Sequence, residues 1–210
     1  MDKLRVDIEK LAEKYSTELK ERMDNRSKEM KADDNSHYLI YQVLGISSEE
    51  GRLIDSYQNK GRFLYKYAGS FVEDAVKICF KFKFPDAERI IVPNTIGSRP
   101  KTFEIDCLVH KNAFEIKWRD ATTDGDHITK EHTKIKVVQL HGYKPIRIMF
   151  YRPNREQAIR IQDTIKTLYQ GVGGEYYSGD EAWDYLRDYT GVDLKKILTT
   201  IAQSKTGVKS

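Results

Sequence analysis

Residues 102–119, TFEIDCLVHKNAFEIKWR, constrain the fold more than any other stretch of the chain. Apolar and polar side chains alternate along the two halves of this stretch, and a period of two is typical of half-buried β-strands. Lys111 and Asn112 separate the halves, and we interpret them as the two-residue turn of a β-hairpin. The sequence therefore predicts an antiparallel pair of strands with one apolar and one charged face.

The charged face of this hairpin brings carboxylates beside amines. A turn at Lys111-Asn112 sets Asp106 opposite Lys117, with Glu115 diagonal to Asp106 on the same side. Two or three carboxylates beside an amine can hold a hard divalent cation and activate water, which is the chemistry of phosphodiester hydrolysis. The residues expected on this face are Glu104, Asp106, Glu115, Lys117 and Arg119.

A second interpretation of the same face is that it is simply solvated. Charged residues make up 32% of the chain, so an acidic residue two positions before a lysine recurs by chance, as in Glu18-Leu-Lys20. Cross-strand charge pairs are also common on the exposed faces of antiparallel sheets. Only Glu115-Ile-Lys117 lies in a strand pattern with an acidic strand just before it, and spacing alone leaves both interpretations open.

Length and composition limit the class of protein. At 210 residues the chain can form one domain with a substantial core, or one domain with an appended helical part. No apolar run approaches the length of a membrane helix, and the first residues lack the apolar segment of a signal peptide. The two cysteines, Cys79 and Cys107, both occur in apolar patterns, so we expect buried thiols in the reducing cytoplasm. The net charge of +4 permits a polyanionic partner without requiring one.

The order of the expected elements predicts an α/β fold, in the sense of an α+β mixed sheet flanked by helices. The run PIRIMFY, residues 145–151, reads as a strand that a helical crossover makes parallel to the strand carrying Glu115. A further strand is expected at residues 90–92. Helices are expected at residues 3–31, 37–44, 47–67, 69–80, 126–140 and 155–169, with two more within 179–202.

The helix expected at residues 47–67 mixes basic and aromatic side chains, including Lys60, Arg62 and Tyr57. This mixture suits a surface that binds nucleic acid. It equally suits a core helix whose lysine stems cover apolar surface while their charges reach water. The sequence leaves the two alternatives open.

The order of the elements and the charged hairpin resemble the PD-(D/E)XK nuclease superfamily, whose common core is a mixed sheet between helices. The motif of that superfamily reads here as Asp106, eight intervening residues, and Glu115-Ile116-Lys117. The proline that precedes the aspartate in the motif is Ile105 in this chain. Many members also place a glutamate on the helix before the sheet, and Glu73 occupies that place. The resemblance covers roughly residues 69–151.

A closer resemblance extends over most of the chain. Three segments, NKGRFLYKYAGSFVEDA, FEIKWRDATTDGDHITKEH and GDEAWDYLRDYTGVDLKKIL, are similar to type II restriction endonucleases akin to ApaLI. The resemblance implies a homodimer that cuts double-stranded DNA at a short palindrome, with Mg²⁺ as cofactor. It also implies three parts: an N-terminal helical region for dimer or DNA contacts (1–68), a catalytic core (69–170) and C-terminal helices packed on that core (171–210).

The resemblance assigns roles to the motif residues. Asp106 and Glu115, with the carbonyl of Ile116, would hold Mg²⁺ through the oxygen ligands that this cation prefers. Lys117 would orient the attacking water and stabilise the negative charge that develops on the phosphate. Glu73 would complete the catalytic set, as a ligand of a second ion or of a metal-bound water.

Sequence recognition needs donors and acceptors near the cut, and the residues that directly follow the catalytic strand are candidates. Those expected to reach base edges are Arg119, Asp120, Thr122, Thr123, Asp124 and His127. Those expected to contact phosphates are Lys60, Arg62, Arg99 and Lys101. For the segment DATTDGD, residues 120–126, the alternative is an ordinary helix start with acidic residues in its first turn.

Two other functions fit the same residues. A DNA repair or junction-resolving nuclease would use the same core and cut by structure rather than by sequence. A non-catalytic DNA-binding module would bind DNA with a steep dependence on salt and leave it intact in Mg²⁺.

Overall fold

The computed structural model describes residues 2–97, 99–119 and 125–207, except for the side chains of residues 125–127. The described chain forms two compact units. One unit contains the first residues up to Glu9 and everything from Val72 onward, and the other spans Lys10–Phe71. The helices α1 (Asp2–Ala32) and α3 (Ser48–Lys83) contribute residues to both units, and the first unit also contains the sheet.

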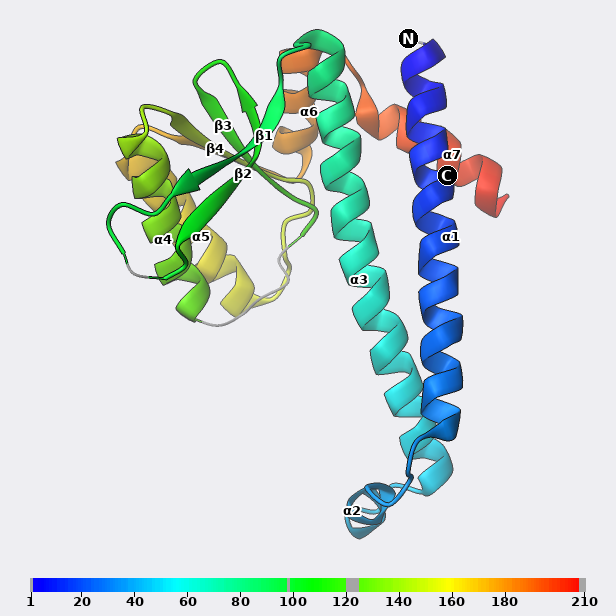
Figure 1. The fold of residues 1–210 in the computed structure, drawn as a ribbon. Coiled ribbons are helices and arrows are strands. Elements are labelled where there is room, and N and C mark those ends of the chain that lie inside the picture. Colours follow the sequence, from blue (N-terminus) through cyan, green and yellow to red (C-terminus); the bar gives the residue numbers. More distant parts are fainter. Residues whose placement is uncertain (1, 98, 120–124, 208–210) are drawn as a thin grey trace. The chain divides into compact units, whose positions relative to one another are not determined.

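The sheet of the first unit has five strands in the order β1 to β5 (Figure 1). β1, β2 and β3 pair antiparallel, whereas β3, β4 and β5 pair parallel. The expected mixed sheet is confirmed, as is the parallel pairing of β3 with β4. The strands are β1 (Glu88–Pro93), β2 (Thr102–Val109), β3 (Asn112–Lys117), β4 (Lys144–Met149) and β5 (Glu175–Ser178).

β5 is a strand that the sequence analysis missed. It has only four residues, and it lies at the start of the part, residues 171–210, for which only helices are expected. A run this short carries too little alternation to be recognised. Its pairing with β4, rather than its own pattern, makes it a strand.

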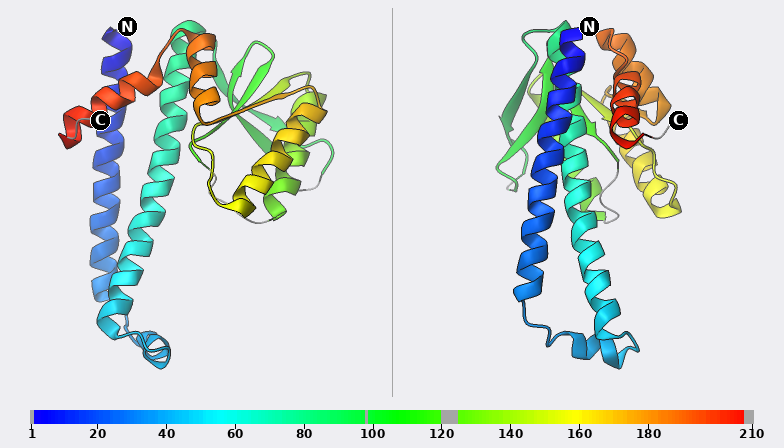
Figure 2. Two further views of the ribbon diagram at one scale, coloured as in Figure 1. Left: turned by 180° about the vertical axis from the view of Figure 1, so that it is seen from behind. Right: turned by 90° about the vertical axis from the view of Figure 1, so that its right-hand side faces the viewer.

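One face of the sheet is covered by α4 (Gly125–Leu140) and α5 (Glu156–Gly171), which lie side by side in Figures 1 and 2. Apolar side chains of both helices pack on the strands below them. One buried cluster contains Ile135, Met149, Ile161, Ile165, Tyr169 and Tyr176, and another contains Val92, Phe103, Ile105, Ala113, Val137 and Val138. These clusters fix α4 firmly above β2, β3 and β4.

The other face is covered by the C-terminal end of α3 (Ser48–Lys83) and by α6 (Asp180–Thr190). The ring of Phe114 on β3 contacts both helices. Its centre lies 4.4 Å from the ring centre of Phe80 on α3 and 5.4 Å from that of Tyr189 on α6. The last helix, α7 (Leu194–Thr206), is capped at its N-terminus by Asp193, whose carboxylate accepts a hydrogen bond from the backbone N–H of Lys196. Both expected C-terminal helices are therefore present.

The second unit pairs most of α1 (Asp2–Ala32) with the first part of α3, and the short helix α2 (Tyr38–Val43) joins them. Within this unit the Tyr15 ring packs edge-on against Tyr67 and Phe71. Nε of Arg26 donates to Oδ1 of Asn59 at 3.2 Å. In the described parts of the chain, no helix combines the length and the apolar character that a membrane span requires.

The helix boundary expected at Gly69 is wrong, because α3 runs through this glycine as a single helix of 36 residues. A glycine inside a helix costs only about 1 kcal/mol relative to alanine. Phe71, two residues after this glycine, packs against the ring of Tyr15, and the next residue, Val72, is buried. Tertiary packing therefore outweighs the weak local signal of a glycine.

The hairpin turn lies one residue earlier than expected, at His110-Lys111. His110 adopts a positive φ of 54°, as two-residue hairpin turns require. Val109 then pairs with Asn112, and Cys107 pairs with Phe114. Because a shift of one residue in the turn moves the register by two, Asp106 falls beside Glu115 and not opposite Lys117. Asn112 is held in the strand, where its side-chain amide donates to the hydroxyl of Tyr189 at 2.9 Å.

Strict alternation along β2 is also interrupted next to Asp106. Glu88 of β1 pairs with Leu108, but Ile90 pairs with Ile105, so two steps along β1 match three along β2. The extra residue is a β-bulge at Asp106-Cys107. Bulges re-aim side chains and are frequent beside active sites.

Candidate active site

Asp106 and Glu115 meet where β2 and β3 separate. The ladder between these strands ends at the pair of Cys107 and Phe114. Beyond it, Oδ2 of Asp106 accepts a hydrogen bond of 2.8 Å from the backbone N–H of Ile116. A side-chain carboxylate thus takes over from the backbone ladder, and it brings two carboxylates together with only 4% and 6% of Asp106 and Glu115 exposed.

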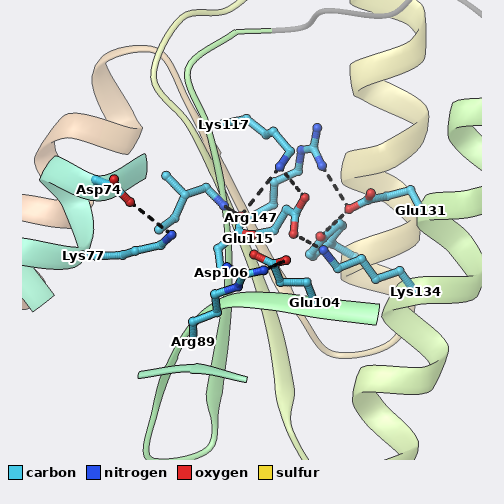
Figure 3. Close-up of polar contacts among 12 residues, drawn as sticks. Asp74, Lys77, Arg89, Glu104, Asp106, Glu115, Lys117, Glu131, Lys134 and Arg147 are labelled. Atoms are coloured by element: carbon cyan, nitrogen blue, oxygen red, sulfur yellow. Dashed lines mark hydrogen bonds and ion pairs between the residues drawn. The ribbon is translucent and has the colours of Figure 1, made fainter. Parts of the chain in front are cut away.

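Lys117 joins these carboxylates from the end of β3 (Figure 3). Its Nζ lies 2.6 Å from Oε1 of Glu115 and 3.7 Å from Oδ2 of Asp106. The Lys117 side chain is 32% exposed, so it is the member of this group that solvent reaches most easily. The three residues of the sequence motif are therefore brought together around one ammonium group.

A second lysine, which the sequence analysis missed, approaches from α4. Nζ of Lys134 forms an ion pair with Oε2 of Glu115, so each oxygen of this carboxylate has its own lysine (Figure 3). Lys134 and the buried Glu131 occupy the face of α4 that also carries the buried residues Ile135 and Val138. Charged residues at core positions of an amphipathic helix were the signal that could have revealed them.

A buried arginine, Arg147 of β4, adds a further positive charge beside Glu115. It lies beside Glu115 in the register of β3 and β4, and it donates from Nη1 to Oε1 of Glu131 at 3.0 Å. The hydroxyl of Tyr169 donates to the same oxygen at 2.6 Å. Arg147 lies between the buried Ile146 and Ile148, and a charged residue flanked by apolar residues in a central strand was again a readable signal.

The two carboxylates differ in their electrostatics. Burial and the neighbouring charge of Glu115 raise the pKa of Asp106 to about 7. Burial acts in the same direction on Glu115, but Lys117, Lys134 and Arg147 outweigh it and hold the pKa of Glu115 well below its usual range. Asp106 therefore titrates near neutral pH, whereas Glu115 stays ionised.

Both lysines remain charged at neutral pH. Burial by itself lowers the pKa of Lys117, but Glu115 and Asp106 raise it above its usual value. The same balance raises the pKa of Lys134. Each ammonium can donate hydrogen bonds and stabilise negative charge, and neither can accept a proton in this state.

The donor set fits a hard divalent cation. Burial and the charge of Glu115 together raise the pKa of Asp106, and a cation between the two carboxylates would remove their mutual repulsion. No group of three His, Cys, Asp or Glu side chains suited to a metal occurs among the described residues. Two carboxylates without a full protein cage are typical of Mg²⁺, which keeps several waters and takes further oxygens from a phosphate substrate.

The two other acidic candidates behave differently. Glu73 lies on α3, is partly buried, and acts on Asp106 as one of the negative charges that raise its pKa. Glu104, expected on the same face as Asp106, forms an ion pair with Arg89 of β1. The structure thus associates Glu73 with the motif and gives Glu104 a partner at the edge of the sheet.

Comparison with known protein families identifies the family of this chain. The family of ApaLI-like restriction endonucleases matches residues 1–203. The chain belongs to this family. It is therefore a restriction endonuclease that acts on DNA, and its mixed sheet with flanking helices is consistent with the restriction-endonuclease-like fold. No curated protein and no solved structure matches the chain.

The residues of this endonuclease that we expected to contact DNA fall into three groups. Arg119, Arg99 and Lys101 are exposed in the unit that holds the sheet, and the Arg119 guanidinium lies 5.7 Å from the Trp118 ring centre. Lys60 and Arg62 are exposed on α3 in the other unit. Asp120, Thr122, Thr123 and Asp124 lie outside the described residues, and for His127 only the backbone, within α4, is described.

The mixed basic and aromatic surface of the endonuclease on α3 is open to solvent. Tyr57 is 69% exposed, and Nζ of Lys60 lies 5.9 Å from the centre of its ring. Arg62 is also exposed. Exposure of these side chains fits both alternatives left open by the sequence, because lysine side chains that cover apolar surface also keep their charges in water.

Proposed function

We propose that this endonuclease is a type II enzyme that hydrolyses both strands of double-stranded DNA at a short palindromic site, with Mg²⁺ as cofactor. The observation that carries the proposal is the position of Lys117, whose Nζ lies 2.6 Å from Glu115 and 3.7 Å from Asp106. Two carboxylates and an ammonium at the splayed end of a hairpin are the groups that metal-assisted hydrolysis of a phosphodiester needs. Glu73 is the fourth residue of the proposed catalytic set.

Asp106, Glu115 and the backbone carbonyl of Ile116 are the proposed metal-binding groups. When bound there, Mg²⁺ would supply Lewis acidity toward the scissile phosphate and toward water. Asp106 is fixed for this role because its Oδ2 accepts the hydrogen bond from the N–H of Ile116. Glu115 stays ionised at neutral pH because of its positive neighbours, so its carboxylate needs no deprotonation before it binds a cation.

Lys117 is proposed to bind a non-bridging phosphate oxygen and to orient the attacking water. Its charge is retained at neutral pH, since the neighbouring carboxylates raise its pKa. An ammonium aimed at the phosphate stabilises the extra negative charge of the pentacovalent transition state. In this role Lys117 donates hydrogen bonds throughout and is not the general base.

The proposed homodimer follows from the need to cut two antiparallel strands. A palindrome presents the same sequence on each strand, and a two-fold dimer presents the same site to each of them. Arg119, Asp120, Thr122, Thr123, Asp124 and His127 are proposed for base contacts, and Lys60, Arg62, Arg99 and Lys101 for phosphate contacts.

The decisive experiment is cleavage of a long phage DNA by the purified protein in Mg²⁺, with EDTA in a parallel reaction. We expect discrete fragments whose sequenced ends reveal one palindrome, and no cleavage in EDTA. Lys117→Ala should reduce the cleavage rate by at least about a hundredfold, the range seen when a transition-state donor is removed. Lys111→Ala, in the exposed turn of the same hairpin, is the matched control and should cut like the wild type.

Three results would contradict the proposal. Wild-type cleavage by Lys117→Ala would remove the site from this hairpin. Nicked or heterogeneous products would point to a structure-specific nuclease. DNA that is bound but stays intact in Mg²⁺, for substrates covering all short palindromes without methylation, would point to a binding module.

A further inference from the structure

Lys134 is a charged residue that contacts Glu115 directly and that the proposed mechanism does not use. It comes from α4, distant in sequence from the hairpin, and its ammonium pairs with Oε2 of Glu115 (Figure 3). Its side chain is only 16% exposed. Burying an ammonium costs several kcal/mol unless a partner compensates for it. For Lys134 that partner is Glu115, which is also a proposed metal ligand.

In the metal-free protein, both oxygens of the Glu115 carboxylate are paired with lysines. Lys117 occupies Oε1 and Lys134 occupies Oε2, so neither carboxylate oxygen is left without a cation. A divalent ion that binds Glu115 must compete with at least one ammonium. It would also be repelled by any ammonium that remains within a few ångströms.

Lys134 is the lysine better placed to give way. Lys117 also approaches Asp106 and sits on the same strand as Glu115, so it contacts both proposed ligands. Lys134 forms an ion pair with Glu115, and the charges of Asp106 and Glu131 also act on it. Of these two, Glu131 lies on the same helix as Lys134, one turn earlier. A swing toward Glu131 would release Oε2 of Glu115 and keep the ammonium paired.

We propose that Lys134 is a built-in counter-cation for Glu115, which a divalent ion must displace before the site is loaded. Lys134 therefore stabilises the metal-free fold and weakens metal binding, and it is a positioning residue rather than a catalytic one. This inference rests on the proposed metal site at Asp106 and Glu115. It deepens that proposal by stating what the site holds before the metal arrives.

The test is metal binding by the full-length protein without DNA, with Mn²⁺ as the probe and electron paramagnetic resonance or calorimetry as the readout. Lys134→Gln keeps a hydrogen-bond donor for Glu115 and removes the charge. We expect the Kd for Mn²⁺ to fall by about tenfold, because one buried positive charge no longer opposes the ion. Lys134→Arg keeps the charge and should bind Mn²⁺ like the wild type. Lys136→Met, at an exposed position of the same helix, is the control for general effects on α4.

Thermal unfolding separates displacement from a purely structural role. In EDTA, Lys134→Gln should melt below the wild type, and saturating Mn²⁺ should raise its Tm by more than it raises that of the wild type. A residue that only supports the fold would lower Tm equally with and without Mn²⁺. If Lys134→Gln does not fold in EDTA, folding on addition of Mn²⁺ supports the proposal, and failure to fold with Mn²⁺ overturns it.

The outcomes distinguish this inference from the proposed function. Glu115→Gln should abolish the binding of Mn²⁺ at this site in the wild-type background. If the wild type shows no binding that depends on Glu115, the proposed metal site and the role of Lys134 both fail. If that binding is present but Lys134→Gln leaves the Kd unchanged or raises it, the role of Lys134 alone is overturned.

Discussion

At the scale of single residues, Asp106 and Glu115 are neighbouring carboxylates with opposite electrostatics. Both are buried, but Glu115 has a lysine at each oxygen, whereas Asp106 accepts a backbone hydrogen bond and faces the charge of Glu115. Ionised Glu115 is consequently stabilised by its surroundings, and ionised Asp106 is destabilised by them. Conservative substitutions of the two residues should therefore change stability in opposite directions.

For Asp106→Asn we predict loss of cleavage together with a more stable metal-free protein above pH 7. An unperturbed aspartate has a pKa of about 4, and the fold raises the pKa of Asp106 to about 7. Between these values the unfolded chain ionises first, so the stability of the wild type falls as pH rises through this window. The asparagine keeps an acceptor for the N–H of Ile116 and removes the penalty, which is at most about 4 kcal/mol at 1.4 kcal/mol per pKa unit.

The measurement is denaturant unfolding of wild type and Asp106→Asn in EDTA at pH 8 and at pH 4. The difference should be present at pH 8 and shrink toward zero at pH 4, where the folded carboxyl is protonated and the unfolded one is about half protonated. An asparagine variant that is less stable than the wild type at pH 8 would show that Asp106 is not penalised in the fold.

For Glu115→Gln we predict the opposite sign. The pKa of Glu115 is lowered in the fold, so its ionised form contributes stability above an unfolded pKa of about 4, and this contribution is lost only as pH falls through the lowered folded value. At neutral pH the glutamine leaves Lys117 and Lys134 without their shared carboxylate. Breaking a buried pair in this way costs on the order of 3–5 kcal/mol. Unfolding at pH 7 in EDTA measures the loss, and unchanged stability would contradict the paired arrangement.

At the scale of elements, the sequence predicted the motif hairpin and the parallel pairing of β3 with β4, and it missed the side chains that reach the motif from other elements. The residues of the motif lie within one hairpin, so alternation alone brought Asp106, Glu115 and Lys117 to one place. The turn was misplaced by one residue because alternation does not mark where a turn begins, and the bulge at Asp106 is set by pairing with β1. Lys134 and Arg147 reach Glu115 from α4 and β4, and such pairings cannot be read from spacing along the chain.

The continuous course of α3 through Gly69 gives a prediction at this scale. A Cβ added at Gly69 meets no other atom within 4 Å, and the residue lies inside a helix. Gly69→Ala should therefore stabilise the protein by about 0.5–1 kcal/mol. Gly191, which ends α6 with a φ of +76°, is the matched control, and Gly191→Ala should destabilise because alanine is strained there. Chemical denaturation measures both, and a loss of stability for Gly69→Ala would argue for a helix break at this position.

At the scale of the whole molecule, the sequence predicted the class of fold. The mixed sheet and its covering helices followed from the order of strand and helix patterns. The chain passes from one unit to the other within α3, between Phe71 and Val72, where no helix break marks the boundary. The roles expected for the N-terminal helices and the C-terminal helices stay predictions.

The exposed basic and aromatic surface of α3 carries the last prediction, which concerns how the unit Lys10–Phe71 takes part in DNA binding. If Lys60 contacts a phosphate, Lys60→Ala should weaken binding to every DNA sequence alike and reduce the slope of log K against log salt by about 1. The cleavage rate of Lys60→Ala at saturating DNA should equal that of the wild type. Lys20, exposed on α1 in the same unit, supplies the matched control Lys20→Ala, which leaves the net charge of the unit equal to that of Lys60→Ala. Binding is measured by fluorescence anisotropy over a salt series in Ca²⁺ or EDTA, and equal slopes for the two variants would mean that Lys60 acts only through overall charge.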